Sequence, residues 1–354
     1  MMSQNIDEVT VPTPEDDDHQ KKGLWWRFNA WLRGLTRRQK LLGAIGLVAA
    51  ALVIVVAILA WYLILRKPIT ELPGLAVEVA PGYSYSISGV SRPLGVALDE
   101  EGNRVYVTQS DGNRTVKVFD FDGNPLGELL PPDDGFSHSS TYVAVDPSTR
   151  NVYVTDRGSN SLLVYDSEGK YLRTVKPDGA KNWGPLAIEI DKDGLIYVAD
   201  ANAAPQRIWV FEADGRVVRT FGESETLSFP NGIALYEDGT VAVADSNHTQ
   251  VIVYNADGTF RGKLAKGEAD AALGMPRGLA VGAKDRLYVV DTTNAVVRVF
   301  KPANDGVPEF AIMFGEIGQL EGQFLYPNDV DTDEHGHIFV TDRENNRVQV
   351  WTNR

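Results

Sequence analysis

An aspartate recurs at one position of a repeated segment, where its carboxylate could either bind a metal ion or cap a loop. Five of the six copies have it at the end of a short alternating apolar stretch: Asp156, Asp200, Asp245, Asp291 and Asp342, with Gln109 in the first copy. Because every copy must make the same turn after this stretch, the repetition favours the structural role. We therefore interpret these carboxylates as loop caps.

Arginines lie in variable loops of four copies, and grouped guanidinium groups bind carboxylates well. They are Arg92, Arg157, Arg277 and Arg343. If the copies close into a ring, these loops belong to neighbouring units and would suit a carboxylate, an acidic glycan or an acidic loop of a partner. The alternative is structural, since Arg157 and Arg343 directly follow Asp156 and Asp342 and could pair with acidic neighbours.

Polar residues in the same loops complete the candidate ligand-binding set: Tyr142, Asn231, Asn328 and Asp329. Asn and Asp oxygens on converging loops could bind Ca²⁺, so Asn231, Asn328 and Asp329 are also the candidates for a metal site. No other cofactor is expected, and the lack of cysteine excludes thiolate metal sites and cysteine nucleophiles. No residue is assigned a catalytic role, because no Ser-His-Asp order or phosphate loop stands out.

The repeated segment also predicts the fold. Its copies contain short alternating strands and Asp-Gly turns, and the inner strands begin 45 to 51 residues apart, at Gly95, Tyr142, Ala187, Gly232, Gly278 and Asp329. This period is typical of a β-propeller, and six units imply six blades of an all-β fold. The sixth unit has three strands before Arg354, and a separate strand near residues 83–88 would supply the fourth and close the ring.

Such a fold sorts its loops between two faces. We call one the loop face, made of the loops that lead into inner strands and those that follow second strands. The other is the turn face, made of the Asp-Gly turns. All the candidate ligand-binding residues are predicted on the loop face, where a rigid scaffold presents recognition loops. The histidines do not converge, because His335 and His337 fall on the turn face and His138 and His248 two blades apart, so no zinc site is predicted.

Motifs in the last units resemble the NHL repeat family. They are Phe314-Gly315-Glu316-Ile317-Gly318, Gly322-Gln323-Phe324 and Asp342-Arg343-Glu344-Asn345-Asn346-Arg347-Val348, with Pro276-Arg277-Gly278 in unit five. The resemblance covers about residues 83–351 and implies a six-bladed propeller of a family that mostly recognises proteins or nucleic acids. Some of its relatives, including peptidyl-amidoglycolate lyase and gluconolactonase-like propellers, are metal-dependent enzymes. The segments around Asn231 and Asn328 are similar to gluconolactonase-like ligand motifs, but the acidic first-blade ligand has no match at Arg92-Pro93-Leu94-Gly95.

The segment before the repeat predicts a membrane anchor. Residues 1–20 are polar and acidic and are expected to be a disordered tail, and residues 21–40 mix basic and aromatic side chains as juxtamembrane segments do. Residues 41–65 carry no charge and are long enough to cross a bilayer as one helix. A linker at 66–82 then leads to the propeller at 83–354. A buried soluble helix and a cleaved signal peptide fit the length of this span less well.

Charge predicts the topology and limits the partners. Seven Lys and Arg precede the span within twenty residues and two follow it, so the N-terminus is expected in the cytoplasm and the propeller outside the plasma membrane. Residues 1–74 contain nine basic and seven acidic residues, so the remaining 25 and 41 give residues 75–354 a formal charge of −16. Such a domain would repel nucleic acid. We expect a binding or scaffold module for a protein, glycan or acidic small ligand, the alternative being a divalent-metal-dependent lactonase-type hydrolase.

Overall fold

A computed structural model describes residues 33–64, 78–264 and 272–353. The chain divides into two compact units after Val77. The predicted acidic tail at 1–20, most of the basic segment at 21–40 and most of the linker at 66–82 lie outside the described residues. Each unit is considered separately below.

The first unit contains the helix α2 (Arg37–Ile64), 28 residues long. The helix begins with a capping box, in which the Gln39 backbone N–H donates to Thr36 Oγ1 and the Thr36 N–H donates to Gln39 Oε1 at 2.9 Å. This cap explains why the helix begins four residues before the predicted start at Leu41. An 18-residue window within Arg37–Ala60 has a mean hydropathy of 3.0, and no part of that window is buried inside the protein. By length and composition the helix could cross a membrane.

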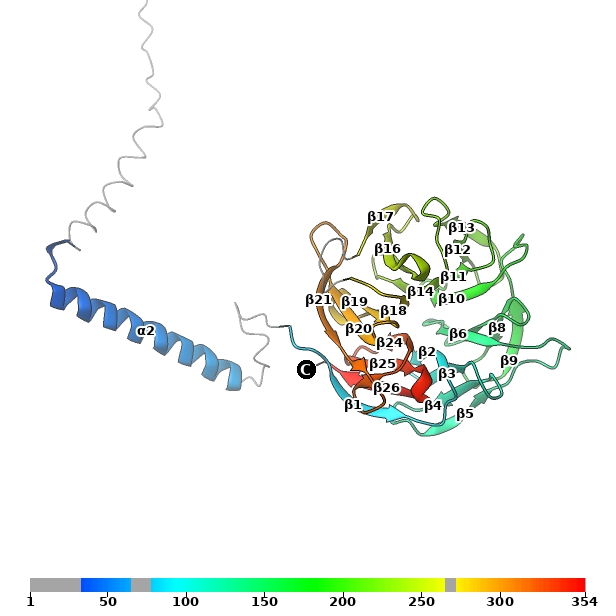
Figure 1. Cartoon of the computed structure of the whole chain (residues 1–354), viewed down its shortest axis with the longest axis horizontal. Coiled ribbons are helices and arrows are strands. Elements are labelled where there is room, and N and C mark those ends of the chain that lie inside the picture. The colour runs from blue at the N-terminus through cyan, green and yellow to red at the C-terminus, as the bar shows by residue number, and fades with distance from the viewer. Residues whose placement is uncertain (1–32, 65–77, 265–271, 354) are drawn as a thin grey trace, which may run out of the picture. The chain divides into compact units, whose positions relative to one another are not determined.

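The second unit is a six-bladed β-propeller, as predicted (Figure 1). Its described residues form six four-stranded antiparallel sheets arranged in a ring. Blade one has β2 (Pro93–Asp99), β3 (Arg104–Gln109), β4 (Val116–Phe119) and β5 (Pro125–Leu129). Blade two has β6 (Ser140–Val145), β7 (Val152–Asp156), β8 (Ser161–Tyr165) and β9 (Tyr171–Val175). Blade three has β10 (Pro185–Ile190), β11 (Ile196–Asp200), β12 (Arg207–Phe211) and β13 (Val217–Phe221).

The remaining blades follow the same order, except for the last. Blade four has β14 (Pro230–Leu235), β15 (Val241–Asp245), β16 (Gln250–Tyr254) and β17 (Phe260–Lys263). Blade five has β18 (Pro276–Gly282), β19 (Arg286–Asp291), β20 (Val296–Lys301) and β21 (Glu309–Phe314). Blade six has β24 (Pro327–Thr332), β25 (His337–Asp342), β26 (Arg347–Thr352) and, as its outer strand, β1 (Gly82–Ile87). Short parallel strands β22 (Glu316–Ile317) and β23 (Gln323–Phe324) and the 3₁₀ turns η2 (Ser246–His248), η4 (Ala283–Asp285) and η5 (Arg343–Asn345) lie in loops.

Local sequence explains the shape of each blade. Five inner strands begin with a proline, which has no N–H to donate and is tolerated at the first position of a strand. A register shift follows at once, as between Pro230 and Gly232 in blade four. The opposite end of this strand is closed by a tight turn in which Gly239 has φ +83° and Asp238 Oδ1 accepts the Thr240 N–H at 2.8 Å. Glycine adopts this φ without the steric penalty that other residues incur.

The hydrophobic core lies between neighbouring blades rather than at the centre of the ring. The second strands are fully buried because each blade covers the face of the next, and Tyr106, Tyr153 and Tyr288 are 0 to 1% exposed. One cluster joins blades six and one, with Ile87, Val107 and Phe339 among its members. The ring is therefore held by the packing between its blades.

The predicted ring closure is confirmed. Strand β1 pairs antiparallel with β26, from Gly82 opposite Thr352 to Ile87 opposite Val348. The first strand of the propeller thus completes the last blade and covers the edge of β26 that would otherwise be open.

We expect replacement of Ile87 by alanine to lower the free energy of unfolding by about 2–4 kcal/mol, because a buried aliphatic side chain would leave a cavity at the closing seam. Ile87 is 1% exposed. Urea unfolding of the full chain in detergent, followed by circular dichroism, measures the change. The matched control is Leu126→Ala on the outer strand of blade one, where the side chain is 54% exposed and a change within about 0.5 kcal/mol is expected. Equal effects of the two substitutions would contradict this account of the closure.

Candidate functional site on the loop face

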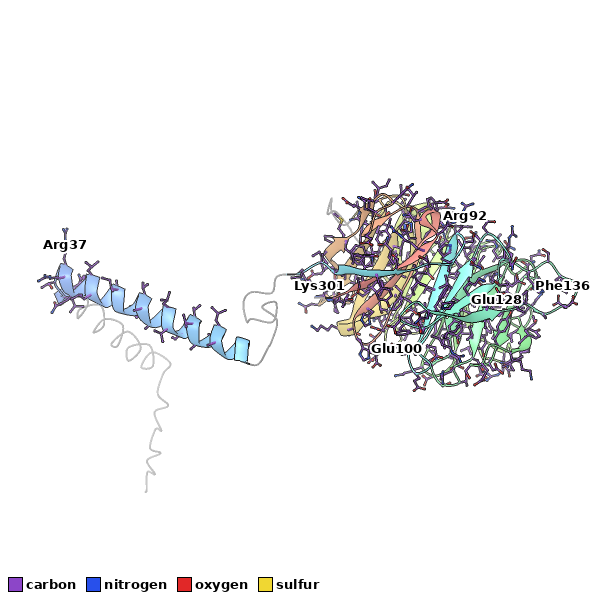
Figure 2. The ribbon with its side chains drawn as sticks, turned by 90° about the horizontal axis from the view of Figure 1, so that it is seen from below. Arg37, Arg92, Glu100, Glu128, Phe136 and Lys301 are labelled. Carbon is purple, nitrogen blue, oxygen red and sulfur yellow. The ribbon has the colours of Figure 1, made fainter. Side chains whose placement is uncertain are left out.

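The loop face and the turn face lie at opposite ends of the blades. Figure 2 shows Arg92, just before the inner strand of blade one, and Glu100, just after it, on opposite sides of the propeller. Arg92 and Tyr326 each precede a proline and adopt left-handed backbone conformations, with φ of 47° and 59°. Phe229 does the same in blade four with φ 59°, so the strained turn is a feature of the repeat rather than of one blade.

Three of the four predicted arginines lie together, two of them against Tyr326 and the third joined to them through Glu344. The guanidinium groups of Arg277 and Arg343 lie 5.2 and 5.5 Å from the centre of the Tyr326 ring. Arg92 Nη2 forms an ion pair with Glu344 Oε1 at 2.6 Å, and Arg343 Nη1 lies 3.6 Å from the same oxygen. We call Arg92, Arg277, Arg343, Tyr326 and Glu344 the arginine cluster. It joins blades five, six and one.

Positive charge exceeds negative charge within this cluster. Two of its three guanidinium groups, those of Arg92 and Arg343, share the single carboxylate of Glu344. The third, that of Arg277, donates to Asn328 Oδ1 at 2.5 Å. Burial, followed by the nearby charges of Arg92 and Arg277, lowers the pKa of Arg343. In the described structure the Nε atoms of all three arginines are buried without a hydrogen-bond partner. Crowded, under-neutralised cations of this kind favour the binding of an anion.

Asn328, Tyr142 and Asp329 lie directly beneath the cluster. Asn328 Nδ2 donates to the Leu94 carbonyl at 2.9 Å and to Tyr142 Oη at 3.2 Å. Burial is the main cause that raises the pKa of Tyr142, so its hydroxyl stays protonated. Asp329 Oδ2 accepts the Val96 N–H at 3.0 Å, which ties blade six to blade one, and burial raises the pKa of this carboxyl well above its usual range.

Asn231 and Arg157 are on the predicted face but are not joined to the cluster. Asn231 is 2% exposed, and its Nδ2 donates to Ser246 Oγ at 2.9 Å within blade four. Within the described residues, no ion pair or hydrogen bond connects the Arg157 side chain with the arginine cluster. The Arg157 backbone N–H donates to the Ser139 carbonyl at 3.0 Å. The alternative, that Arg343 pairs with an acidic neighbour, is met by Glu344 at 3.6 Å. It is not met by Asp342, whose Oδ2 accepts from Arg347 Nε at 2.8 Å.

The repeated aspartates cap loops, as predicted. Each is 0 to 1% exposed and accepts a backbone N–H from the loop that leads into the inner strand of its own blade. Examples are Asp156 with Ser139, Asp245 with Ser228 at 2.7 Å and Asp342 with Leu325 at 2.7 Å. Gln109 does the same in blade one by accepting the Ser91 N–H at 2.8 Å.

A central channel runs between the inner strands and holds partly buried carboxylates that were not predicted from the sequence. Its cavity of about 210 Å³ is lined by all six inner strands. Burial, with the neighbouring charges of Asp331 and Asp329, raises the pKa of Glu189 well above its usual range. Burial likewise raises the pKa of Asp331 to about 7. The sequence feature that could have identified these carboxylates is an acidic residue inside an apolar strand, as in Ala187-Ile188-Glu189-Ile190.

The candidate ligands for a divalent ion, Asn231, Asn328 and Asp329, do not fit such an ion. The side-chain oxygen of Asn328, Oδ1, accepts a hydrogen bond from the guanidinium of Arg277, and this positive charge would repel a metal ion at that position. Among residues 33–64, 78–264 and 272–353, no group of three or more His, Asp or Glu side chains is placed to hold a metal. We therefore assign no metal ion to this site.

The fold and motifs define the class of protein: a six-bladed β-propeller with an NHL repeat in its last blade, preceded by an apolar helix. The NHL repeat family matches residues 324–351. The chain is 29% identical over 186 residues to the E3 ubiquitin-protein ligase NHLRC1 of Rattus norvegicus, covering 49% of this chain and 46% of that protein. It is 31% identical over 146 residues to YncE of Escherichia coli (strain K12), covering 41% and 39%. The chain thus spans less than half the length of these relatives.

Solved structures share the fold at low sequence identity. A gluconolactonase from Xanthomonas campestris has a TM-score of 0.60 at 16% identity, with 78% of this chain and 95% of that chain covered. A streptogramin B lyase has a TM-score of 0.55 at 15% identity, with 77% and 98% covered. At these identities the likeness concerns the arrangement of blades and says nothing of a shared activity.

We expect Asp331→Asn to flatten the dependence of the protein's stability on pH between about pH 5 and 8, because the side chain can no longer ionise. The pKa of Asp331 is about 7 in the folded protein, above the unfolded value of about 4, so the folded state holds the proton more tightly. The stability that this group contributes is present below about pH 4 and is lost as the pH rises to about 7. Thermal melting between pH 5 and 8.5 measures the effect.

The matched control is Asp193→Asn, an exposed carboxyl on the turn face, which should leave the pH profile unchanged. If Asp331→Asn melts with the same pH profile as the unsubstituted protein, the buried carboxyl is not the source of the dependence. Glu189 and Asp329 also have raised pKa values, so part of the slope is expected to remain.

Proposed function

We propose that this protein is a membrane-anchored binding module whose propeller recognises an anionic ligand through the arginine cluster on its loop face. The observation that carries the proposal is the packing of Arg277 and Arg343 on Tyr326, with Arg92 joined to Arg343 through Glu344, the one carboxylate among the three arginines. Guanidinium groups bind carboxylates with directed hydrogen bonds, so the excess of positive charge supports an acidic ligand.

A protein partner is the form of this function that the relatives support best. The name of the rat relative describes a ligase that acts on proteins, and the matching half of this chain includes propeller repeats. The acidic charge of residues 75–354 argues against nucleic acid as the ligand. No contact in the described site favours the metal-dependent hydrolase.

We also propose a single-pass topology in the plasma membrane, with the N-terminus in the cytoplasm and the propeller outside. Helix α2 is long and apolar enough to cross the bilayer. Seven Lys and Arg precede its apolar part within twenty residues, against two that follow it, and the positive-inside rule places the richer side in the cytoplasm.

Binding of a fluorescein-labelled hexaglutamate peptide tests the anion site. We expect the full chain in nanodiscs to bind this peptide in fluorescence anisotropy, and the double substitution of Arg277 and Arg343 by glutamine to weaken binding at least about tenfold. Arg216→Gln is the matched control, since Arg216 is an exposed arginine paired with Glu212 away from the cluster. Affinity should fall as salt is added.

Melting curves of each variant establish that it is folded. Absence of binding, or equal binding by the double variant, would sink the proposal. A melting temperature that rises with Ca²⁺ and returns with chelator would support the metal-dependent alternative instead.

The lack of native cysteine makes the topology directly testable. We expect a cysteine introduced by Asp193→Cys in the propeller to react with a membrane-impermeant maleimide in intact cells. A cysteine introduced by Ser3→Cys should react only after the cells are lysed. The reverse pattern would place the propeller in the cytoplasm.

A further inference from the structure

Two exposed apolar side chains lie in the loop that leads into blade six. Ile317 and Leu320 are 69% and 71% exposed, the highest values among the large hydrophobic side chains of the propeller's described residues. A single exposed apolar residue is ordinary, but two within one short loop beside a charged cluster are characteristic of an interaction surface.

This loop is held in one conformation. Strand β22, which contains Ile317, pairs with β23, and the Gly318 N–H donates to the Phe324 carbonyl at 2.9 Å. Phe324 is fully buried against Trp351, with ring centres 5.6 Å apart. Because the backbone is already ordered, contacts with Ile317 and Leu320 would cost little conformational entropy on binding.

Hydrogen bonds connect this loop with the arginine cluster. Asn345, two residues after Arg343 in η5, donates through Nδ2 to the Gly318 carbonyl at 3.0 Å. Arg347 Nη2 donates to the Leu320 carbonyl at 2.7 Å. The apolar pair and Arg343 are therefore carried by two loops that are joined by hydrogen bonds.

Glu344 shows which chemical group suits the arginines. Its carboxylate reaches Arg92 and Arg343 from a polypeptide backbone, and the Glu344 N–H donates to the Leu325 carbonyl at 3.0 Å. An acidic side chain on a second polypeptide would present the same group to the cluster, whose positive charge one carboxylate does not neutralise.

We propose that this surface binds an extended segment of a partner polypeptide in which an acidic side chain lies within a few residues of apolar side chains. The carboxylate meets Arg277 and Arg343, and the apolar side chains pack on Ile317 and Leu320. The proposal rests on the anion-binding function above and adds the class of partner. Charge complementarity favours an acidic segment, and the exposed apolar pair favours a polypeptide over a polyanionic glycan.

The test is selection of random twelve-residue peptides on the full chain in nanodiscs, with removal of peptides that bind empty nanodiscs. We expect enrichment of sequences that combine Asp or Glu with Leu, Ile or Phe. A selected peptide should bind about 5- to 30-fold more weakly to the Ile317→Ser, Leu320→Ser double variant. The control is Leu126→Ser, Leu172→Ser, which removes two exposed apolar side chains from outer strands and should leave the affinity unchanged.

The remaining outcomes separate this inference from the proposed function. Acidic peptides without apolar residues, whose binding depends on Arg277 and Arg343 but not on Ile317 and Leu320, would overturn the inference and leave the anion site standing. The same holds if labelled polygalacturonate binds in an arginine-dependent way while no peptide is enriched. Peptides without acidic residues, bound equally by the Arg277→Gln, Arg343→Gln variant, would overturn both.

Discussion

The pairing of β1 with β26 is the contact on which the propeller depends. A ring of sheets buries its blades only if the last blade meets the first, and here one strand from the start of the propeller completes the sheet at its end. Closing so long a loop costs conformational entropy, but this cost grows only slowly with chain length. It is offset by the apolar cluster around Ile87 and by the hydrogen bonds of the ladder.

Ring closure also creates the candidate site. Arg92 and Glu344 are 252 residues apart in sequence and meet only because blades six and one are neighbours. The contact between blades six and one also explains polar residues that could be taken for catalytic or metal-binding groups. Asp329 and Asp331 accept the N–H groups of Val96 and Leu98, so blade six holds the inner strand of blade one by its backbone. Burying these carboxylates raises their pKa values, and this is the energetic cost of a polar seam.

The repeat was sufficient to predict the blades, the closing strand and the aspartate caps, because these depend on local periodicity and on turns that every unit must make. Neighbouring blades also predicted that Arg277, Arg343 and Arg92 could meet. Contacts between side chains could not be read in the same way. Sequence position could not show that Arg157 has no described contact with the cluster while Glu344 has one, since both facts follow from how particular loops pack.

A single position shows how the ring becomes asymmetric. The second residue of each inner strand is Leu94, Thr141, Leu186, Asn231, Arg277 and Asn328 in order around the ring. Among the described contacts, this position reaches the cluster in blades five and six alone. There the Arg277 guanidinium donates to the Asn328 amide oxygen, and Asn328 donates across the seam to Leu94.

The described ends of the propeller chain lie away from this half of the loop face. Glu78, which precedes β1, pairs with Arg286 at 2.7 Å, and the Asn353 N–H donates to the Gly336 carbonyl at 3.0 Å. Arg286 begins a second strand and Gly336 lies in an Asp-Gly-type turn, so the first and last described residues of the propeller are both on the turn face. Residues on the loop face can therefore differ from blade to blade without disturbing the closure of the ring.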